Sequence, residues 1–327
     1  MKIVKLFPAE DGKYHFGDHM LESTSLIFHS DSLFSAIINN YRKLYPINVK
    51  EDVEHLKNIK ISSVFPAYDD VLFIPRPITK LNFGKKMENY IEKKSKDIKN
   101  IEFISLKALR DHNNGTLDFN IETVIDKKFL ISKDEDKREN IFFEITEEKV
   151  GINRTNNKAS EGNLFVISYV KPQDNTYFYF FLDEKVENDI KKKLYASIRL
   201  IADEGLGGER TSGAGLFDEI KIEDYNGFEN YYIDSNYNMS LSLVFPKDKT
   251  EFECAETYQL VERKGFIYFA KGSGSRKKGI LMIKEGSIFK ENIEGKVIDV
   301  SPNDECTICK FGRFFGIPIK YIENDPK

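Results

Sequence analysis

The residues best suited to chemistry gather in one glycine-rich stretch, residues 205–215, with the sequence GLGGERTSGAG. Glycine has no Cβ, so its backbone N–H groups can come close to an anion. An arginine in such a stretch can pair with a phosphate through two hydrogen bonds, and threonine and serine hydroxyls add donors. The composition therefore predicts contact with a polyanion. The residues expected to bind it are Gly205, Gly207, Gly208, Arg210, Thr211, Ser212, Gly213 and Gly215.

This stretch does not match the glycine-rich motifs that bind nucleotides. In a P-loop the second glycine is followed by lysine and then serine or threonine, whereas Ala214 and Gly215 follow Gly213 here. A dinucleotide fingerprint beginning at Gly205 would need glycine at the position of Arg210. Both motifs also lead from a strand into a helix, whereas this stretch follows an expected helix. We therefore disfavour nucleotide ligands, and the alternative to a polyanion site is a flexible connector.

Two further segments combine basic residues with small polar ones, GINRTNNKASEGN in the middle of the chain and KGSGSRKKG near its end. Such segments can contact phosphates without a sequence preference. The alternative is a solvated turn in the first case and a charged hairpin tip in the second. The residues expected to make such contacts are Arg154 and Lys158 in the first segment and Arg276 and Lys277 in the second.

Three histidines, His15, His19 and His29, lie in the first thirty residues. Two of them could act as a general acid and a general base in RNA cleavage. The alternative is that His29 flanks the start of a helix and the other two lie in a loop. We assign no catalytic residue.

The cysteines and aspartates do not indicate a metal site. Cys306 and Cys309 form a CxxC pair, but zinc needs two more ligands and Cys254 is the one cysteine left. Asp31 is explained as an acid in the first turn of a helix, and Asp69–Asp70 as part of a turn. We expect neither a metal nor a cofactor.

Hydrophobic periodicity indicates the elements that must position these residues. Ser30 as N-cap begins a helix with an apolar stripe of period three and four, and Pro46 stops it. A second helix is expected between Asp183 as N-cap and Gly205 as C-cap. The lysine-rich residues 85–100 and the acidic residues 134–148 are expected to be insertions or solvated helices. The expected strands of this part are residues 2–7, 59–65, 71–74, 163–170, 176–182 and 216–222.

Beyond residue 226 the pattern becomes strand-rich, and a turn is expected at Lys264–Gly265. We therefore expect two domains, residues 1–227 and 228–327. The first follows the β-α-β-β-α-β order of ferredoxin-like folds, in which RNA-recognition modules offer an open sheet face to bases. The expected strands of the second are residues 241–245, 258–261, 266–270, 280–284, 296–300 and 314–322.

Composition limits the class of protein. The 327 residues are 40% hydrophobic and 31% charged, which is typical of a soluble globular protein. No stretch approaches the ~20 apolar residues of a spanning helix, the N-terminus lacks the pattern of a signal peptide, and three cysteines make no disulfide scaffold. We expect a cytoplasmic protein. The net charge of −4 excludes a chain-wide basic coat but leaves room for a local basic groove.

The glycine-rich stretch with its flanks, LIADEGLGGERTSGAGLF, resembles the signature loop of the RAMP superfamily of CRISPR proteins. Several further segments resemble one family within it, the fourth Csm subunit of the type III-A CRISPR effector complex. The resemblance runs in order from about Lys2 to Ile319. The segments that carry it are HFGDHMLESTSLIFHSDSLFSAI, FIPRP, GINRTNNKASEGNLF, LMIKEGSIF and VIDV.

This resemblance implies an α+β fold of two ferredoxin-like domains, the second degenerate. It also implies a non-catalytic subunit that holds the repeat-derived 5′ tag of the guide RNA. The implied protein partners are the large palm-domain subunit and the backbone RAMP subunit, with no membrane. One alternative is an endoribonuclease of the same superfamily that processes guide precursors. Another is an assembly scaffold without an RNA site.

Overall fold

The computed structural model describes most of the chain, with gaps. The described residues are 1–17, 20–47, 49–84, 87, 91, 93–153, 158–231, 233–266, 276–302 and 307–323, without the side chains of 151–153, 158–163, 230 and 231.

A mixed sheet forms the centre of the fold, and nine of the strands found in the described residues belong to it. Four of them form an antiparallel group in the order β11-β1-β10-β3. A short strand, β2 (Lys60–Ile61), pairs with the end of β10. The four strands are β1 (Lys2–Pro8), β3 (Phe65–Tyr68), β10 (Thr176–Asp183) and β11 (Phe217–Asp224).

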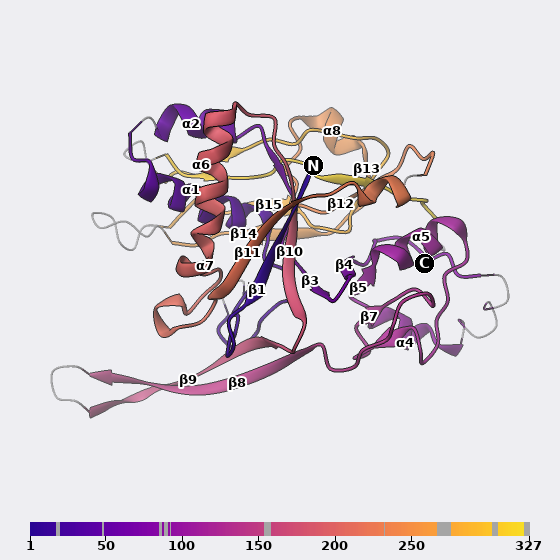
Figure 1. Ribbon diagram of the computed structural model, residues 1–327, viewed down its shortest axis with the longest axis horizontal. Helices are drawn as coiled ribbons and strands as arrows, with labels where there is room; N and C mark the ends of the chain where they lie inside the picture. The colour runs from indigo at the N-terminus through magenta and orange to yellow at the C-terminus, as the bar shows by residue number, and fades with distance from the viewer. Residues whose placement is uncertain are drawn as a thin grey trace.

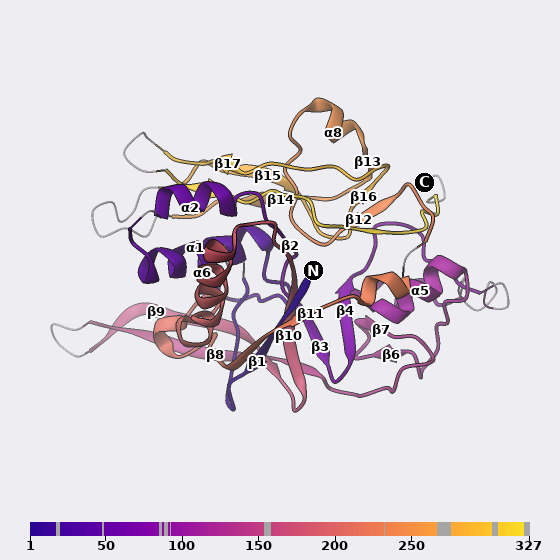
Figure 2. The ribbon, with the colours of Figure 1, turned by 45° about the horizontal axis from the view of Figure 1, so that its top comes forward.

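Helices cover one face of this group. They are α1 (Ser30–Leu44), α2 (Val49–Leu56), α6 (Asn188–Arg199) and α7 (Ile201–Glu204), of which α1, α2 and α6 lie together in both ribbon views (Figures 1 and 2). The expected stripe of α1 is buried against alternate residues of β1 and β10, because strand side chains alternate between faces. The core on this side includes Val4, Leu6, Leu33, Phe34, Ile37, Phe178, Phe180, Leu194 and Ile198.

Both predicted N-caps are wrong. Helix α1 already includes Ser30, whose hydroxyl oxygen accepts a hydrogen bond from the Leu243 N–H (3.0 Å), and His29 is the N-cap. Asp183 is still in β10, because it pairs with Lys60, and α6 starts five residues later with Glu187 as its cap. In each case the predicted cap residue instead contacts a residue that is distant in sequence, Leu243 for Ser30 and Lys60 for Asp183.

The other face of the sheet is also covered, so it is not open to bases as it is in RNA-recognition modules. Tyr179 and Phe181 of β10 pack against Met239, Phe315 and neighbouring residues of the C-terminal part. These come from β12 (Asn238–Ser240) and from the region of β19 (Gly316–Pro318), which belong to a second sheet of order β13-β16-β12-β19. Its other members are β13 (Ala255–Thr257) and β16 (Ile288–Phe289).

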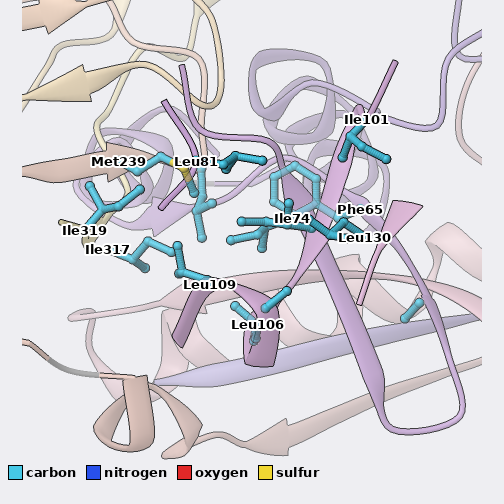
Figure 3. Packing of buried hydrophobic residues seen from close by; sticks show 14 of the residues in the cluster. Phe65, Ile74, Leu81, Ile101, Leu106, Leu109, Leu130, Met239, Ile317 and Ile319 are labelled. Carbon is cyan, nitrogen blue, oxygen red and sulfur yellow. The ribbon is translucent and has the colours of Figure 1, made fainter. Parts of the chain in front are cut away.

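The middle of the chain extends the central sheet beyond β3. Strands β4 (Val71–Pro75), β5 (Phe103–Ser105), β7 (Phe129–Leu130) and β6 (Val124–Ile125) continue it, with β5 and β7 parallel. Helices α4 (Ser95–Lys99) and α5 (Leu106–Asn114) accompany them. The buried side chains of α4 and α5 belong to the same hydrophobic core as buried side chains of the C-terminal part. Figure 3 shows Leu106 and Leu109 of α5 near Ile317, Ile319 and Met239.

A long hairpin leaves the body of the molecule. It consists of β8 (Phe142–Asn153) and β9 (Lys158–Pro172), which pair with each other and extend outward in Figure 1. The acidic residues 134–148 therefore end in a strand. The lysine-rich residues 85–100 are described only in part and include α4.

The C-terminal part is strand-rich as expected, although the boundaries differ. Residues 241–245 follow β12 and are not a regular strand. Residues 267–270 of the expected strand 266–270 lie outside the described residues. The 3-10 helix η3 (Gly227–Tyr231) contains the expected domain boundary, which stays a prediction. The remaining elements are α8 (Lys249–Glu253), β14 (Leu260–Arg263), β15 (Ile280–Ile283), β17 (Ile298–Asp299) and β18 (Cys309–Lys310).

Among the helices built from described residues, none combines the length and the hydrophobicity that crossing a bilayer requires.

Candidate nucleic-acid interface

The glycine loop, residues 205–215, connects α7 to β11 and is closed at its base. The Leu206 N–H donates to the Gly215 carbonyl (2.9 Å), and the side chains of Leu206 and Ala214 are buried. The Gly208 N–H donates to the His15 carbonyl (2.9 Å), and the Gly215 N–H to the Lys13 carbonyl (2.8 Å). The loop is therefore fixed to the segment that follows β1.

Several glycines are required by this packing. At Gly207 the backbone has φ +93°, and a Cβ would lie 2.5 Å from the His15 carbonyl oxygen. At Gly215, with φ +83°, a Cβ would lie 2.2 Å from the Leu206 carbonyl oxygen. Gly213 has the same positive φ but open space around it. Most of the bare backbone thus lies against protein, and the tip is the part that remains accessible.

The tip carries the polar residues singled out in the sequence. Arg210, Thr211 and Ser212 form the 3-10 turn η2 (Arg210–Ser212), and all three are exposed. The Arg210 Nη1 donates to the Glu204 carbonyl (3.2 Å), which orients the guanidinium on the surface. An anion at the tip would meet this charge and two hydroxyl groups.

A lysine–tyrosine cluster on the β8–β9 hairpin lies beside the loop, and no sequence pattern indicated it. The Lys149 ammonium donates to the Tyr169 hydroxyl (2.8 Å) and to Glu209 Oε2 (3.2 Å), and Lys13 Nζ lies 4.7 Å from the centre of the Tyr169 ring. Burial would lower the pKa of Lys149, but these bonds raise it above its usual value. Lys149 therefore keeps its positive charge next to the loop.

A cavity of about 90 Å³ opens next to the glycine loop. Its wall combines the loop, the start of α1 and β14, which are far apart in sequence. The polar and glycine residues that line it are His15, Gly17, His29, Ser32, Gly207, Gly208 and Arg263.

Two of the three candidate histidines face this cavity, and each is held by an acceptor. The buried His15 donates from Nδ1 to the Ser168 carbonyl (2.8 Å), which leaves Nε2 as an acceptor in the neutral ring. His29 donates from Nδ1 to Glu285 Oε1 (2.8 Å), which also accepts from Ser63 Oγ. Burial alone would raise the pKa of Glu285, but the His29 charge holds it below its usual range. His19 lies outside the described residues.

Asp31 lies in the first turn of α1, as expected, and it also forms buried ion pairs with Arg263 and Lys310. Its carboxylate is fully buried and receives two bonds from Arg263, Nη2 to Oδ1 (3.0 Å) and Nε to Oδ2 (3.1 Å). Lys310 also donates to it. Burial would raise the pKa of Asp31, but the two cations lower it. The partners lie 232 and 279 residues further along the chain, so no local pattern could reveal them.

The other residues predicted from the sequence to bind RNA belong to two segments, one in the C-terminal part and one in the middle of the chain. Arg276 lies 5.2 Å from the centre of the exposed Phe266 ring, and the half-buried Lys277 bonds through its N–H to the Gly265 carbonyl. Burial first, and then the charge of Lys310, lower the pKa of Lys277, so Lys277 belongs electrostatically to the Asp31 cluster.

Arg154 lies outside the described residues, and Lys158 is described only as backbone at the far end of the hairpin. Of the described side chains of the hairpin, Lys149 contacts the glycine loop, through Glu209 (3.2 Å). Among the described residues no group of histidine, cysteine or acidic side chains could hold a metal, and Cys306 of the CxxC pair is outside them.

Comparison with known proteins identifies the class to which this fold and loop belong. The sequence model of the RAMP superfamily matches residues 14–218, which include the whole glycine loop. A second model, described as the CRISPR Csm4 C-terminal domain, matches residues 233–319. The protein is thus a member of the RAMP superfamily, and within it the chain belongs to the Csm4 family of CRISPR proteins. The resemblance stated from the sequence is confirmed.

Relatives cover nearly the full length of the chain. A CRISPR system protein Csm4 from Methanocaldococcus jannaschii is 37% identical, covering 93% of this chain and 90% of the relative. One from Streptococcus thermophilus is 25% identical, covering 92% and 93%. In a crystal structure of the Csm3–Csm4 subcomplex of the type III-A CRISPR-Cas interference complex, the similar chain has a TM-score of 0.73 at 31% identity, covering 98% and 100%. A chain of a Csm1–Csm4 cassette with cA4 shares the fold, with a TM-score of 0.61 at 16% identity, covering 99% of both chains.

Proposed function

We propose that this protein is a non-catalytic RNA-binding and assembly subunit of a type III-A CRISPR interference complex, in which it holds the repeat-derived 5′ tag of the guide RNA. The observation that carries the proposal is the rigid glycine loop, which presents Arg210, Thr211 and Ser212 to solvent. The two bonds to the Lys13 and His15 carbonyls fix this tip before any ligand arrives. A preformed donor set loses little conformational entropy when an anion binds.

Binding should come from phosphates more than from bases. The sheet face that stacks bases in RNA-recognition modules is buried here beneath Met239 and Phe315. Arg210 at the loop tip can neutralise a phosphate despite the net charge of −4, whereas Lys13 and Lys149 are ion-paired with Glu147 and Glu209 and would have to exchange these carboxylates for a phosphate. The affinity for the tag should therefore fall steeply as salt increases.

The same proposal includes two ferredoxin-like domains, residues 1–227 and 228–327. Support for the first comes from the antiparallel order β11-β1-β10-β3 and from α1 and α6 on one face, with β-α-β-β-α-β order along the chain. Support for a degenerate second domain comes from its sheet β13-β16-β12-β19, since the one α-helix described there, α8, has five residues.

The proposed protein partners are the backbone RAMP subunit and the large palm-domain subunit. Support comes from a relative of 31% identity that was crystallised with Csm3, and from the fold shared with chains of Csm1–Csm4 cassettes.

The experiment that tests RNA binding compares two arginine variants in the assembled complex. Arg210→Ala should weaken binding of a 5′-tag oligonucleotide. Arg138→Ala, which removes a surface arginine paired with Asp69 (3.5 Å), should not. Equal affinities for the wild type and the Arg210→Ala complex would remove the loop tip from the RNA site.

An endoribonuclease remains the second candidate, because His15 and His29 line one cavity. This candidate requires that repeat RNA is cleaved and that His15→Ala or His29→Ala abolishes turnover. We expect no cleavage, since both rings are largely buried and their Nδ1 atoms are bound to Ser168 and Glu285. Metal-independent turnover lost in either variant would make this the function.

A further inference from the structure

The glycine loop contains one acid, Glu209, and its carboxylate occupies donors that a phosphate could use. The Lys149 ammonium (3.2 Å) and the Ser212 hydroxyl (3.1 Å) both donate to the same oxygen, Oε2 of Glu209. Burial would raise the pKa of Glu209, but these two bonds hold it below its usual value, so the carboxylate is ionised. The donors come from the hairpin and from the loop tip, and they converge on one anionic oxygen.

Two lysines lie around one buried tyrosine ring next to this point. Lys13 Nζ lies 4.7 Å from the centre of the Tyr169 ring, and Lys149 Nζ lies 5.4 Å from it. Glu147 is the counterion of Lys13, and Glu209 is the counterion of Lys149. Without the Glu209 carboxylate this group of side chains would carry a net positive charge.

The shape of the loop does not depend on the Glu209 side chain. The Glu209 carbonyl accepts from the Ser212 N–H (2.9 Å) and the Ala214 N–H (3.2 Å), so backbone bonds close the turn. The side chain is 28% exposed and can turn toward solvent. The backbone φ of +57° lies in the left-handed region, which favours glycine. A glutamate at such a position is explained if its carboxylate has a use of its own.

We propose that Glu209 is an internal competitor of the guide RNA: its carboxylate holds Lys149 and Ser212 in the free protein, and a backbone phosphate of the RNA replaces it on these two donors. The proposal rests on the proposed function and deepens it, because it names the residue that sets the strength and selectivity of that site. The released carboxylate turns to solvent as the phosphate binds.

This exchange favours a strand over a free anion. An isolated phosphate only replaces one ion pair by another and gains little. A strand already held at Arg210, the residue that follows Glu209, offers its neighbouring phosphate at a high effective concentration. Glu209 therefore excludes small anions from the loop while it yields to a polyanion.

The test uses the full chain, with a matched ion pair as the control. Glu209→Gln removes the charge but keeps a side-chain oxygen that can accept the same bonds. Glu209→Gly, which suits the positive φ, is a second variant without the charge, in case the first one lowers the melting temperature. Lys149→Gln removes the cation on which the exchange takes place. The controls are Glu253→Gln and Lys249→Gln, which break an exposed pair of α8 (3.4 Å) and change the net charge by the same amounts.

The first readout is the affinity for tag RNA at several salt concentrations. Glu209→Gln should bind about two- to fivefold more tightly, because an exposed ion pair no longer has to be broken. Lys149→Gln should bind more weakly, with a salt slope smaller by about 0.7, the share of one phosphate contact. Both α8 controls should match the wild type. If Glu209→Gln binds no more tightly than Glu253→Gln, or if Lys149→Gln keeps the full slope, the exchange does not occur.

A second readout separates this proposal from the proposed function. If Arg210→Ala weakens RNA binding while Glu209→Gln leaves it unchanged, the exchange is wrong and the proposed function stands. If the wild type binds no tag RNA, the proposed function is wrong, and inorganic polyphosphate replaces RNA as the probe. Tighter polyphosphate binding by Glu209→Gln than by Glu253→Gln would then uphold the exchange for another polyanion, and equal binding by the two would overturn it.

Discussion

Asp31 and Arg263 form a buried bidentate ion pair, with bonds of 3.0 and 3.1 Å that join the first turn of α1 to β14. The pair connects the helix layer of the central sheet to the strand-rich C-terminal part. Lys310 of β18 binds the same carboxylate. One side chain therefore holds three elements together next to the proposed RNA site.

Replacing Asp31 should be strongly destabilising. In Asp31→Asn two buried cations lose the Asp31 carboxylate as a counterion, and removal of one partner of a buried pair costs about 3–5 kcal/mol. Denaturant unfolding should show this loss in the free energy of unfolding. Asp97→Asn, which breaks an exposed pair with Lys94 (3.0 Å), serves as the control and should cost less than about 1 kcal/mol. Equal costs for the two variants would show that the buried pair does not hold the elements together.

Arg210→Ala should change the salt dependence of RNA binding as well as the affinity. Each phosphate contact to a single strand contributes a slope of about 0.7 in the logarithm of the binding constant against the logarithm of salt. Loss of one contact should reduce the slope by about that amount, measured by titration of tag RNA at several salt concentrations. Arg138→Ala should keep the full slope, and an unchanged slope in both would place Arg210 outside the contact.

Gly207→Ala and Gly213→Ala distinguish two reasons for glycine in the loop, a positive φ and the close approach of neighbouring backbone. Both positions have positive φ, which costs an alanine about 1–2 kcal/mol. At Gly207 the new methyl group also meets the His15 carbonyl oxygen, so the total should reach about 2–5 kcal/mol. Chemical denaturation of the two variants measures the difference. A larger cost at Gly213 would contradict the observed packing.

His112 should make the protein less stable in mild acid. Its ring accepts at Nδ1 from the Asn82 N–H (3.0 Å) and donates from Nε2 to the Lys320 carbonyl (2.9 Å), so the site fits the neutral ring. Burial lowers the pKa of His112 from 6.5 to about 4. The unfolded chain therefore binds a proton first, and stability falls as the pH drops from about 6.5 toward 4.

Between neutral pH and about pH 4, His112 should lower the free energy of unfolding by roughly 3 kcal/mol. Unfolding free energies between pH 4 and 7 should show it, and His112→Gln should have a flatter profile over this interval than the wild type. His55→Gln, at an exposed position of α2, should retain the wild-type slope. A His112→Gln profile as steep as that of the wild type would exclude this ring as the cause.

Local patterns predicted much of the fold around α1 and β10. The period of Leu33, Phe34 and Ile37 identified the helix, and the apolar run of residues 176–182 identified the strand, because each depends on near neighbours. The helix starts were misplaced where distant residues intervened, as Lys60 does at Asp183.

The candidate site was predicted only in part. The sequence located the glycine loop, but not that Gly207 and Gly215 fit against neighbouring backbone. Nor could it show the Asp31–Arg263 pair or the packing of Phe315 over Phe181, because these contacts join residues more than a hundred positions apart. Periodicity reports one element at a time and contains no information about such pairs.

The β8–β9 hairpin has a consequence for handling the isolated subunit. Beyond its base the two strands pair only with each other among the described residues, so each leaves one row of backbone groups unpaired. Val150 and Leu164 lie opposite each other on this ribbon, and both are exposed. Open strand edges beside apolar side chains favour self-association. Purification without partner subunits should therefore yield aggregates that form through this ribbon, and co-expression with a partner that covers it should keep the chain monodisperse.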